Sequence, residues 1–173
     1  MAVVKAGSPE LLRVSMANDS DSSVYEYVDG EFINLVERQQ REAVAAVAAE
    51  RKRQVYTDPQ TGLMWAKNGS IAGKKMKWDD AMSWAKNLHY GGYSDWRVPS
   101  KKELELFSRR GGNKPSEWFN TNGFNFVQAY DYLSSTAGVG RTGYAGVVDM
   151  YGGYMDDYNK SFSNFVWPVR GGQ

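Results

Sequence analysis

The distribution of tryptophan along the chain constrains its fold more than any other feature. All six tryptophans lie from Trp65 onward, and glycines and other turn residues become frequent from Val55. Large aromatic side chains need a packed core, whereas frequent turn residues indicate short elements. We therefore predict one compact domain over residues 55–173 and a separate N-terminal extension over residues 1–54.

The N-terminal extension contains a candidate hairpin and a candidate helix. Two strand-like runs within residues 24–36 flank Asp29-Gly30, a turn signal of type I′. The alternative is that the helix already begins at Glu31. Residues 37–54 are rich in good helix formers and carry a narrow stripe of small apolar side chains. This helix either mediates homo-oligomerisation or docks on its own domain.

Residues 55–173 are predicted to combine two helices with short strands. One helix is expected from Trp78 to His89. The second is expected from Ser100, where Ser100 and Glu103 form a capping-box pattern. The expected strands are Val55-Tyr56, Leu63-Met64-Trp65, Tyr132-Leu133, Tyr144 to Met150 and Phe165-Val166-Trp167. This pattern indicates the α+β class with a twisted antiparallel sheet.

Four collinear motifs resemble the Lcl C-terminal domain family. They are Asp58-Pro59-Gln60-Thr61-Gly62-Leu63-Met64-Trp65, Trp78-Asp79-Asp80-Ala81, Gly91-Gly92-Tyr93-Ser94-Asp95-Trp96-Arg97-Val98-Pro99 and Val166-Trp167-Pro168-Val169-Arg170-Gly171-Gly172. Leu133 departs from the family, which usually has tryptophan before Ser134-Ser135-Thr136. Within the motifs, Trp65, Trp96 and Trp167 are large enough to form one aromatic core, and Asp95 is placed to pair with Arg97 or Arg170.

The resemblance covers roughly residues 55–173 and implies a C-type-lectin-like fold. In that fold the terminal strands pair, so Val55-Tyr56 should lie near residues 165–167. The irregular segment of about residues 130–164 would then form the ligand-facing surface.

The residue inventory argues against an enzyme. The chain has no cysteine and a single histidine, His89, which excludes thiolate nucleophiles, disulfides and multi-histidine metal sites. It also lacks a nucleophile elbow, a phosphate loop and a dinucleotide fingerprint. We therefore expect no catalytic residue, no metal site and no cofactor. The alternative is calcium, which takes roughly six to eight oxygens; the candidate ligands are Asp149, Asp156, Asp157 and Asn159.

Residues 130–164 have the composition of a binding surface. Tyrosines there are interleaved with Gly, Ser, Asn and Asp, a mixture that combines large amphipathic contacts with adaptable hydrogen bonding. The alternative is that these tyrosines only cover the edge of the core. The predicted ligand-binding residues are Tyr132, Arg141, Tyr144, Asp149, Tyr151, Tyr154, Asp156, Asp157, Tyr158 and Asn159.

The resemblance also suggests two sources of specificity. The ending from Val166 to Gly172 is similar to that of variable proteins of diversity-generating retroelements, which implies diversification of residues 144–159. A fixed-specificity adhesin that binds acidic glycans is the other reading. Its cations would be Lys74, Lys75, Lys77, Lys101, Lys102, Arg109 and Arg110, in a segment (67–114) with 11 Lys/Arg and 5 Asp/Glu.

These features predict a protein or glycan ligand. The net charge of +1 argues against nucleic acid, and there is no apolar run of about 18 residues to span a membrane. The first residues lack a signal-peptide pattern, from which we expect a cytoplasmic location; association with a cell surface or virion remains open.

Overall fold

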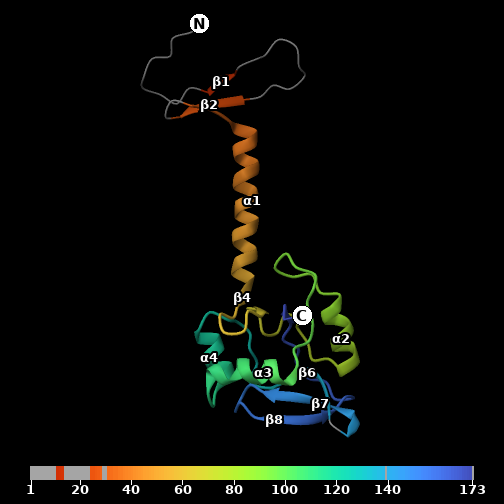
Figure 1. Cartoon of the computed structure of the whole chain (residues 1–173). Helices are drawn as coiled ribbons and strands as arrows, with labels where there is room; N and C mark the ends of the chain where they lie inside the picture. Colours follow the sequence, from red (N-terminus) through yellow and green to blue (C-terminus); the bar gives the residue numbers. More distant parts are fainter. Residues whose placement is uncertain (1–10, 14–23, 29–30, 139, 173) are drawn as a thin grey trace. The chain divides into compact units, whose positions relative to one another are not determined.

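The computed structural model describes residues 11–13, 24–28, 31–138 and 140–172, with the backbone alone for residues 11–13, 24–28 and 31–33. It divides into two compact units, Met1–Ala49 and Glu50–Gln173, which we describe separately (Figure 1). Helices and antiparallel sheets make it an α+β protein, as predicted.

The first unit contains a small antiparallel sheet. Strands β1 (Leu11–Arg13), β2 (Val24–Val28) and β3 (Glu31–Asn34) lie in the order β1–β2–β3. Val28 pairs with Glu31, which confirms the predicted pairing, while the turn at residues 29–30 lies outside the described residues. The alternative that a helix begins at Glu31 is wrong.

Helix α1 (Leu35–Gln54) confirms the predicted helix and begins slightly earlier than expected. Asn34 caps its start, because its Oδ1 accepts hydrogen bonds from the backbone N–H groups of Val36 at 2.9 Å and Glu37 at 3.3 Å. None of the 20 residues of this helix is buried.

In the second unit, a short sheet links the two ends of the domain. Strands β4 (Val55–Thr57), β5 (Met64–Ala66) and β9 (Val169–Arg170) lie in the antiparallel order β4–β5–β9. The predicted strand at residues 165–167 is wrong, and the C-terminal strand pairs with β5 instead of with Val55-Tyr56. Proline has no N–H for a strand ladder, so Pro168 interrupts the pairing, and Val169 and Arg170 form the ladder with β5 instead.

The helices of this unit follow the predictions in part. Helix α2 (Trp78–Lys86) ends before His89 because Asn87 caps it, with its side-chain amide donating to the Ser83 carbonyl at 2.8 Å. Helix α3 (Lys101–Ser108) has the predicted capping box and continues as a 3-10 turn over Arg109–Gly111. Helix α4 (Pro115–Thr121) was not predicted; it is short, and Lys114 at its start offers no side-chain cap.

A three-stranded antiparallel sheet occupies much of the segment predicted to be irregular. Its strands are β6 (Asp131–Gly138), β7 (Arg141–Asp149) and β8 (Met155–Asn159), in the order β6–β7–β8. The strands predicted at Tyr132-Leu133 and from Tyr144 to Met150 are confirmed by β6 and β7, whereas the irregular character expected of residues 130–164 as a whole is wrong. The ladder places side chains at defined positions, which a loop would not do.

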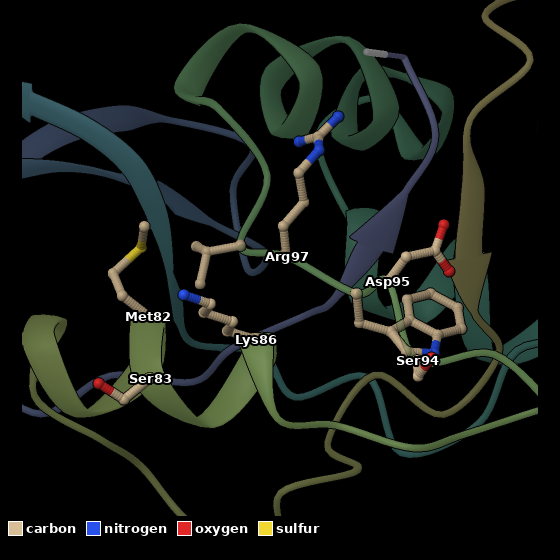
Figure 2. A pocket seen from close by; sticks show the side chains of 8 residues that line it. Met82, Ser83, Lys86, Ser94, Asp95 and Arg97 are labelled. Atoms are coloured by element: carbon tan, nitrogen blue, oxygen red, sulfur yellow. The ribbon is translucent and has the colours of Figure 1, made fainter.

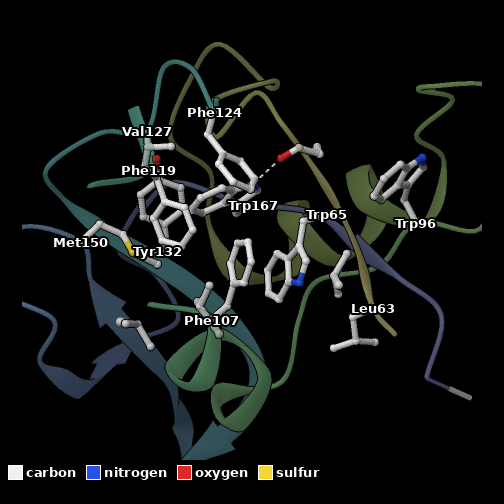
Figure 3. Close-up of a cluster of buried hydrophobic side chains, with 14 residues drawn as sticks. Leu63, Trp65, Trp96, Phe107, Phe119, Phe124, Val127, Tyr132, Met150 and Trp167 are labelled. Carbon is white, nitrogen blue, oxygen red and sulfur yellow. Dashed lines mark hydrogen bonds between the residues drawn. The ribbon is translucent and has the colours of Figure 1, made fainter. Parts of the chain in front are cut away.

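The core confirms the predicted aromatic cluster. Trp65, Trp96 and Trp167 belong to one group of buried side chains and are at most 2% exposed (Figure 3). Phe107 of α3 lies parallel to Trp65, with ring centroids 4.0 Å apart, and Trp167 meets both rings edge-on. This core fixes α3 and α4 against the strands that position the surface described next.

Candidate binding pocket

A hollow of about 420 Å³ lies at one end of the β6–β7–β8 sheet. The segment before β6, the end of β7, the turn after β7 and strand β8 all contribute to it. We call it the tyrosine–aspartate pocket, and its lining is Ala129, Tyr130, Asp131, Asp149, Tyr151, Tyr154, Met155, Asp156 and Tyr158.

The turn between β7 and β8 presents two tyrosines to solvent. Asp149 holds this turn, because its carboxylate oxygens accept hydrogen bonds from the N–H groups of Tyr151 and Gly152, each at 2.9 Å. Gly153 adopts a φ of 77°, which a residue with a side chain would adopt only with strain. As a result, Tyr151 and Tyr154 are 69% and 75% exposed on a turn whose backbone is fixed by hydrogen bonds.

Three carboxylates meet at this end of the sheet. Asp131 of β6 pairs directly with Asp149 of β7, and Asp156 of β8 lines the same pocket. Burial raises the pKa of Asp131, and the neighbouring carboxylates of Asp149 and Asp156 raise it further. A hydrogen bond with Tyr158 and the charge of Lys75 oppose this shift in pKa. The pocket is therefore a site of concentrated negative charge.

The hydroxyl of Tyr158 is part of the same electrostatic system. The carboxylate of Asp131 raises the pKa of Tyr158, followed by burial and by the charges of Asp156 and Asp149. Tyr158 therefore stays a neutral donor, which is the form that can share a proton with Asp131.

A lysine lies over one ring of the pocket. The Lys75 ammonium is 3.2 Å from the ring centroid of Tyr130 and 5.6 Å from that of Phe165. An ammonium at such a distance is attracted by the negative face of the ring. The pocket rim thus already accommodates one cation supplied by the chain.

The structure brings five of the predicted binding residues together in this pocket: Asp149, Tyr151, Tyr154, Asp156 and Tyr158. The expectation that Tyr132 lies on the surface is wrong. Its side chain is 0% exposed, its hydroxyl oxygen accepts a hydrogen bond from the Gln128 N–H at 2.8 Å, and burial raises its pKa to about 12. It is a core residue because both faces of β6 are covered at this position.

Other predicted residues lie elsewhere on the sheet. Tyr144 pairs with Asn159 in the ladder, toward the opposite end of β7 from Asp149. The Arg141 guanidinium lies 3.9 Å from the ring centroid of Tyr144, so these two side chains engage each other.

Asp157 faces away from the pocket because side chains alternate along a strand. Its Oδ1 accepts a hydrogen bond from Lys101 Nζ of α3 at 2.7 Å, whereas its neighbour Asp156 lines the pocket. The candidate calcium ligands therefore do not converge. Among the described residues, no group of three or more acidic, histidine or cysteine side chains could hold a metal ion.

Sequence reasoning did not assign Tyr130, Asp131 or Met155 to the site. Tyr130 belongs to the tyrosine-rich segment, so the composition of that segment could have identified it. Asp131 enters the pocket only because β6 pairs with β7 in this register. No local pattern specifies that pairing.

A larger hollow, of about 580 Å³, lies between α2 and residues 94–98 (Figure 2). Two of the charged side chains that line it, Asp95 and Arg97, form ion pairs within the domain. The Asp95 carboxylate binds Arg170 at 2.6 and 2.9 Å, and this hydrogen-bonded partner lowers the pKa of Asp95. Arg97 instead pairs with Glu103, at 2.7 and 2.8 Å. Of the two partners predicted for Asp95, Arg170 is therefore confirmed and Arg97 is wrong.

Much of the predicted basic face is neutralised within the domain. Lys101 pairs with Asp157, Lys102 and Arg109 pair with Glu105, and Arg110 pairs with the buried Asp58. The remaining lysines of the set line a hollow of about 340 Å³ with Asp80 and Trp84; they are Lys74, Lys75 and Lys77.

These observations define an α+β domain whose motifs build the core and whose least motif-like segment forms a surface pocket. No helix among the described residues is long and apolar enough to cross a membrane. The sequence model of the Lcl C-terminal domain family matches residues 54–170, and the chain belongs to this family. A comparison with curated proteins finds no match.

Proposed function

We propose that the chain is a non-enzymatic binding module that recognises its ligand through the tyrosine–aspartate pocket. The observation that supports this most is the gathering of four tyrosines and three aspartates in one hollow. Two of these rings, Tyr151 and Tyr154, are mostly exposed, although aromatic rings of this size normally contribute to a core.

The rigidity of the turn supports the same proposal. Tyrosine side chains lose little conformational entropy on binding, and the Asp149 cap fixes the backbone that displays them. A surface with these properties can bind without first becoming ordered, which favours affinity.

We further propose that the domain has the C-type-lectin-like fold of its relatives and that residues 144–159 are diversified by a retroelement. The division of roles supports this: the family motifs supply Trp65, Trp96 and Trp167 to the core, whereas Tyr151, Tyr154 and Asp156 are exposed. The test is genomic. A nearby degenerate repeat with substitutions confined to adenines, together with a reverse transcriptase gene, would support diversification, and their absence would refute it.

Selection from a displayed peptide and protein-fragment library tests the binding proposal. The full chain is used as bait, and the selected ligands are measured against the double variant Tyr151→Ala/Tyr154→Ala and the control Phe162→Ala. Phe162 is 60% exposed and does not line the pocket, so its replacement should leave binding unchanged. Failure to select any ligand, or equal binding by the double variant, would contradict the proposal.

The hollow with Lys74, Lys75 and Lys77 favours a second candidate function, the binding of acidic glycans. Trp84 in the same hollow could stack on a sugar ring. Binding there should weaken steeply with ionic strength, whereas contacts through tyrosines should be less sensitive. A glycan array with and without calcium, repeated at high salt, separates the two candidates.

Helix α1 supports a third candidate, assembly into a homo-oligomer. Its exposed side chains include Val36, Val44 and Val47, which are 51%, 70% and 52% exposed. Apolar side chains on one helix are commonly buried by a second copy. Light scattering over a concentration series tests this, and a monomer at high concentration would rule it out.

A further inference from the structure

We propose that the tyrosine–aspartate pocket binds a cationic side chain, arginine or lysine, presented by a protein partner. This inference rests on the binding function proposed above and names the chemistry of its ligand. It is carried by the shape and charge of the pocket and by the aromatic rings around it.

The charges of the pocket are not balanced within the domain. Its lining contains three aspartates and no lysine or arginine, and Lys75 is the cation seen at its rim, over the ring of Tyr130. Asp131 and Asp149 face each other directly across the ladder, and like charges in that position destabilise a sheet. A bound cation would relieve this repulsion.

The three aspartates do not have equivalent roles. Asp149 uses both carboxylate oxygens to hold the turn after β7. Asp156 is exposed, and Asp131 is half-buried beside Tyr158. Asp131 hydrogen-bonds with Tyr158, and Asp156 Oδ1 accepts a hydrogen bond from the Asp157 N–H at 2.7 Å. Unlike Asp149, neither uses both carboxylate oxygens to hold the turn, so Asp131 and Asp156 are the carboxylates of the hollow that we assign to the ligand.

The size of the pocket favours an organic cation over a metal ion. Calcium would need several oxygens around one point, and the described carboxylates include no metal-competent group. A guanidinium or ammonium group can donate hydrogen bonds to carboxylates that are further apart than the ligands of one calcium ion, and it also packs on aromatic faces. A hollow of about 420 Å³ can enclose such a side chain with its aliphatic stem.

The rim indicates that the cation belongs to a macromolecule. Tyr151, Tyr154 and Met155 are 69%, 75% and 45% exposed around the acidic floor. A free amine would leave these surfaces in water. A protein segment would cover them while its basic side chain enters the pocket. The basic side chain would then be an anchor residue, and the contacts with the three exposed side chains would exclude water around it.

The contact between Lys75 and Tyr130 shows the geometry that is expected of the ligand. The ammonium lies 3.2 Å from the ring centroid, on the face of the ring. Tyr151 and Tyr154, from the turn after β7, contribute further rings to the same lining. The pocket can therefore surround a second cation with rings and carboxylates.

Defined peptides test this inference. Short glycine-serine peptides that contain arginine are titrated into the full chain by fluorescence anisotropy, next to matched peptides with citrulline or glutamate in place of arginine. Citrulline keeps the shape of the side chain and removes its charge. We expect the arginine peptide to bind and the other two to bind at least about tenfold more weakly.

Variants locate the site. Asp131→Asn/Asp156→Asn should weaken binding of the arginine peptide about tenfold or more, while keeping the oxygen that can accept from Tyr158. Asp79→Asn is the matched control, because Asp79 is exposed in the first turn of α2 and does not line the pocket. Thermal unfolding of each variant shows that the fold is retained.

The inference is overturned if the citrulline peptide binds as well as the arginine peptide, or if the double aspartate variant binds as well as the wild type. Ligands selected on the Tyr151 and Tyr154 surface provide the separate test of the binding function. If those ligands are neutral and indifferent to Asp131→Asn/Asp156→Asn, the cation inference fails and the proposed function stands. If no ligand binds this surface, both fail.

Discussion

Replacing Phe107 by alanine should destabilise the second unit by about 4 kcal/mol. Its side chain is 2% exposed and lies at the centre of the aromatic core (Figure 3). Removing a fully buried phenylalanine typically costs roughly 3–5 kcal/mol, from lost burial and from the cavity that remains. The rings around it are Tyr56, Trp65, Phe119, Phe124 and Trp167, with centroids between 4.0 and 6.2 Å away.

A loss well above the lower end of this range is expected because the surrounding rings cannot easily collapse into the cavity. Trp65 lies parallel to Phe107 at 4.0 Å, and such aromatic pairs contribute about 0.5–1.5 kcal/mol beyond burial. Planar rings that pack on one another, as Trp65, Phe119 and Trp167 do, relax less than flexible aliphatic chains do. The cavity should therefore persist.

Urea unfolding followed by tryptophan fluorescence measures this effect in the relevant unit, because all six tryptophans lie from Trp65 onward. With a slope of about 2 kcal/mol per M, the midpoint should fall by about 2 M. Phe162→Ala, on a 60% exposed side chain, should change stability by less than about 0.5 kcal/mol. A loss below about 1 kcal/mol for Phe107→Ala would refute the central place of this ring.

Three further outcomes follow from single contacts. Burial opposes the charge of Glu103, but hydrogen bonds from Arg97 and Ser100 outweigh it and lower the pKa of Glu103. Glu103→Gln should therefore lower the melting temperature at neutral pH, and this difference from the wild type should disappear as the pH falls through the folded-state pKa of Glu103. The pKa of Asp131 is raised, so Asp131→Asn should instead stabilise at neutral pH and lose this advantage as pH falls. Gly146→Ala should lower the melting temperature, because the added Cβ would lie 2.5 Å from Lys101 Cδ and 2.9 Å from Oγ of Ser134, which is fully buried; an unchanged value would contradict that packing.

The tryptophans of the core and the start of α3 could be predicted because their signals are local. Ser100 and Glu103 are close in sequence, and their capping box depends only on that spacing. Trp65 and Trp167 carry large apolar rings that favour burial, and both are 0% exposed. These features need no knowledge of which strands pair.

The pocket could be predicted only in part, for a physical reason. Tyr151 and Tyr154 belong to a turn that composition identifies. Tyr132, by contrast, lies in a strand with both faces covered, where simple alternation fails to separate buried from exposed residues. Asp131 meets Asp149 through a register between strands that neither local sequence specifies.

The position of β8 as an outer strand of the order β6–β7–β8 has a consequence for how copies of this domain behave at high concentration. Outer strands can template the addition of another chain and so begin aggregation, and charged side chains discourage this. Asp156 and Asp157 place adjacent negative charges on β8, one toward each face. The charge of Asp157 is balanced by Lys101, but Asp156 is exposed, so a second β8 approaching this edge would bring like charges together at Asp156. The acidic residue that lines the pocket therefore also opposes self-association of the sheet.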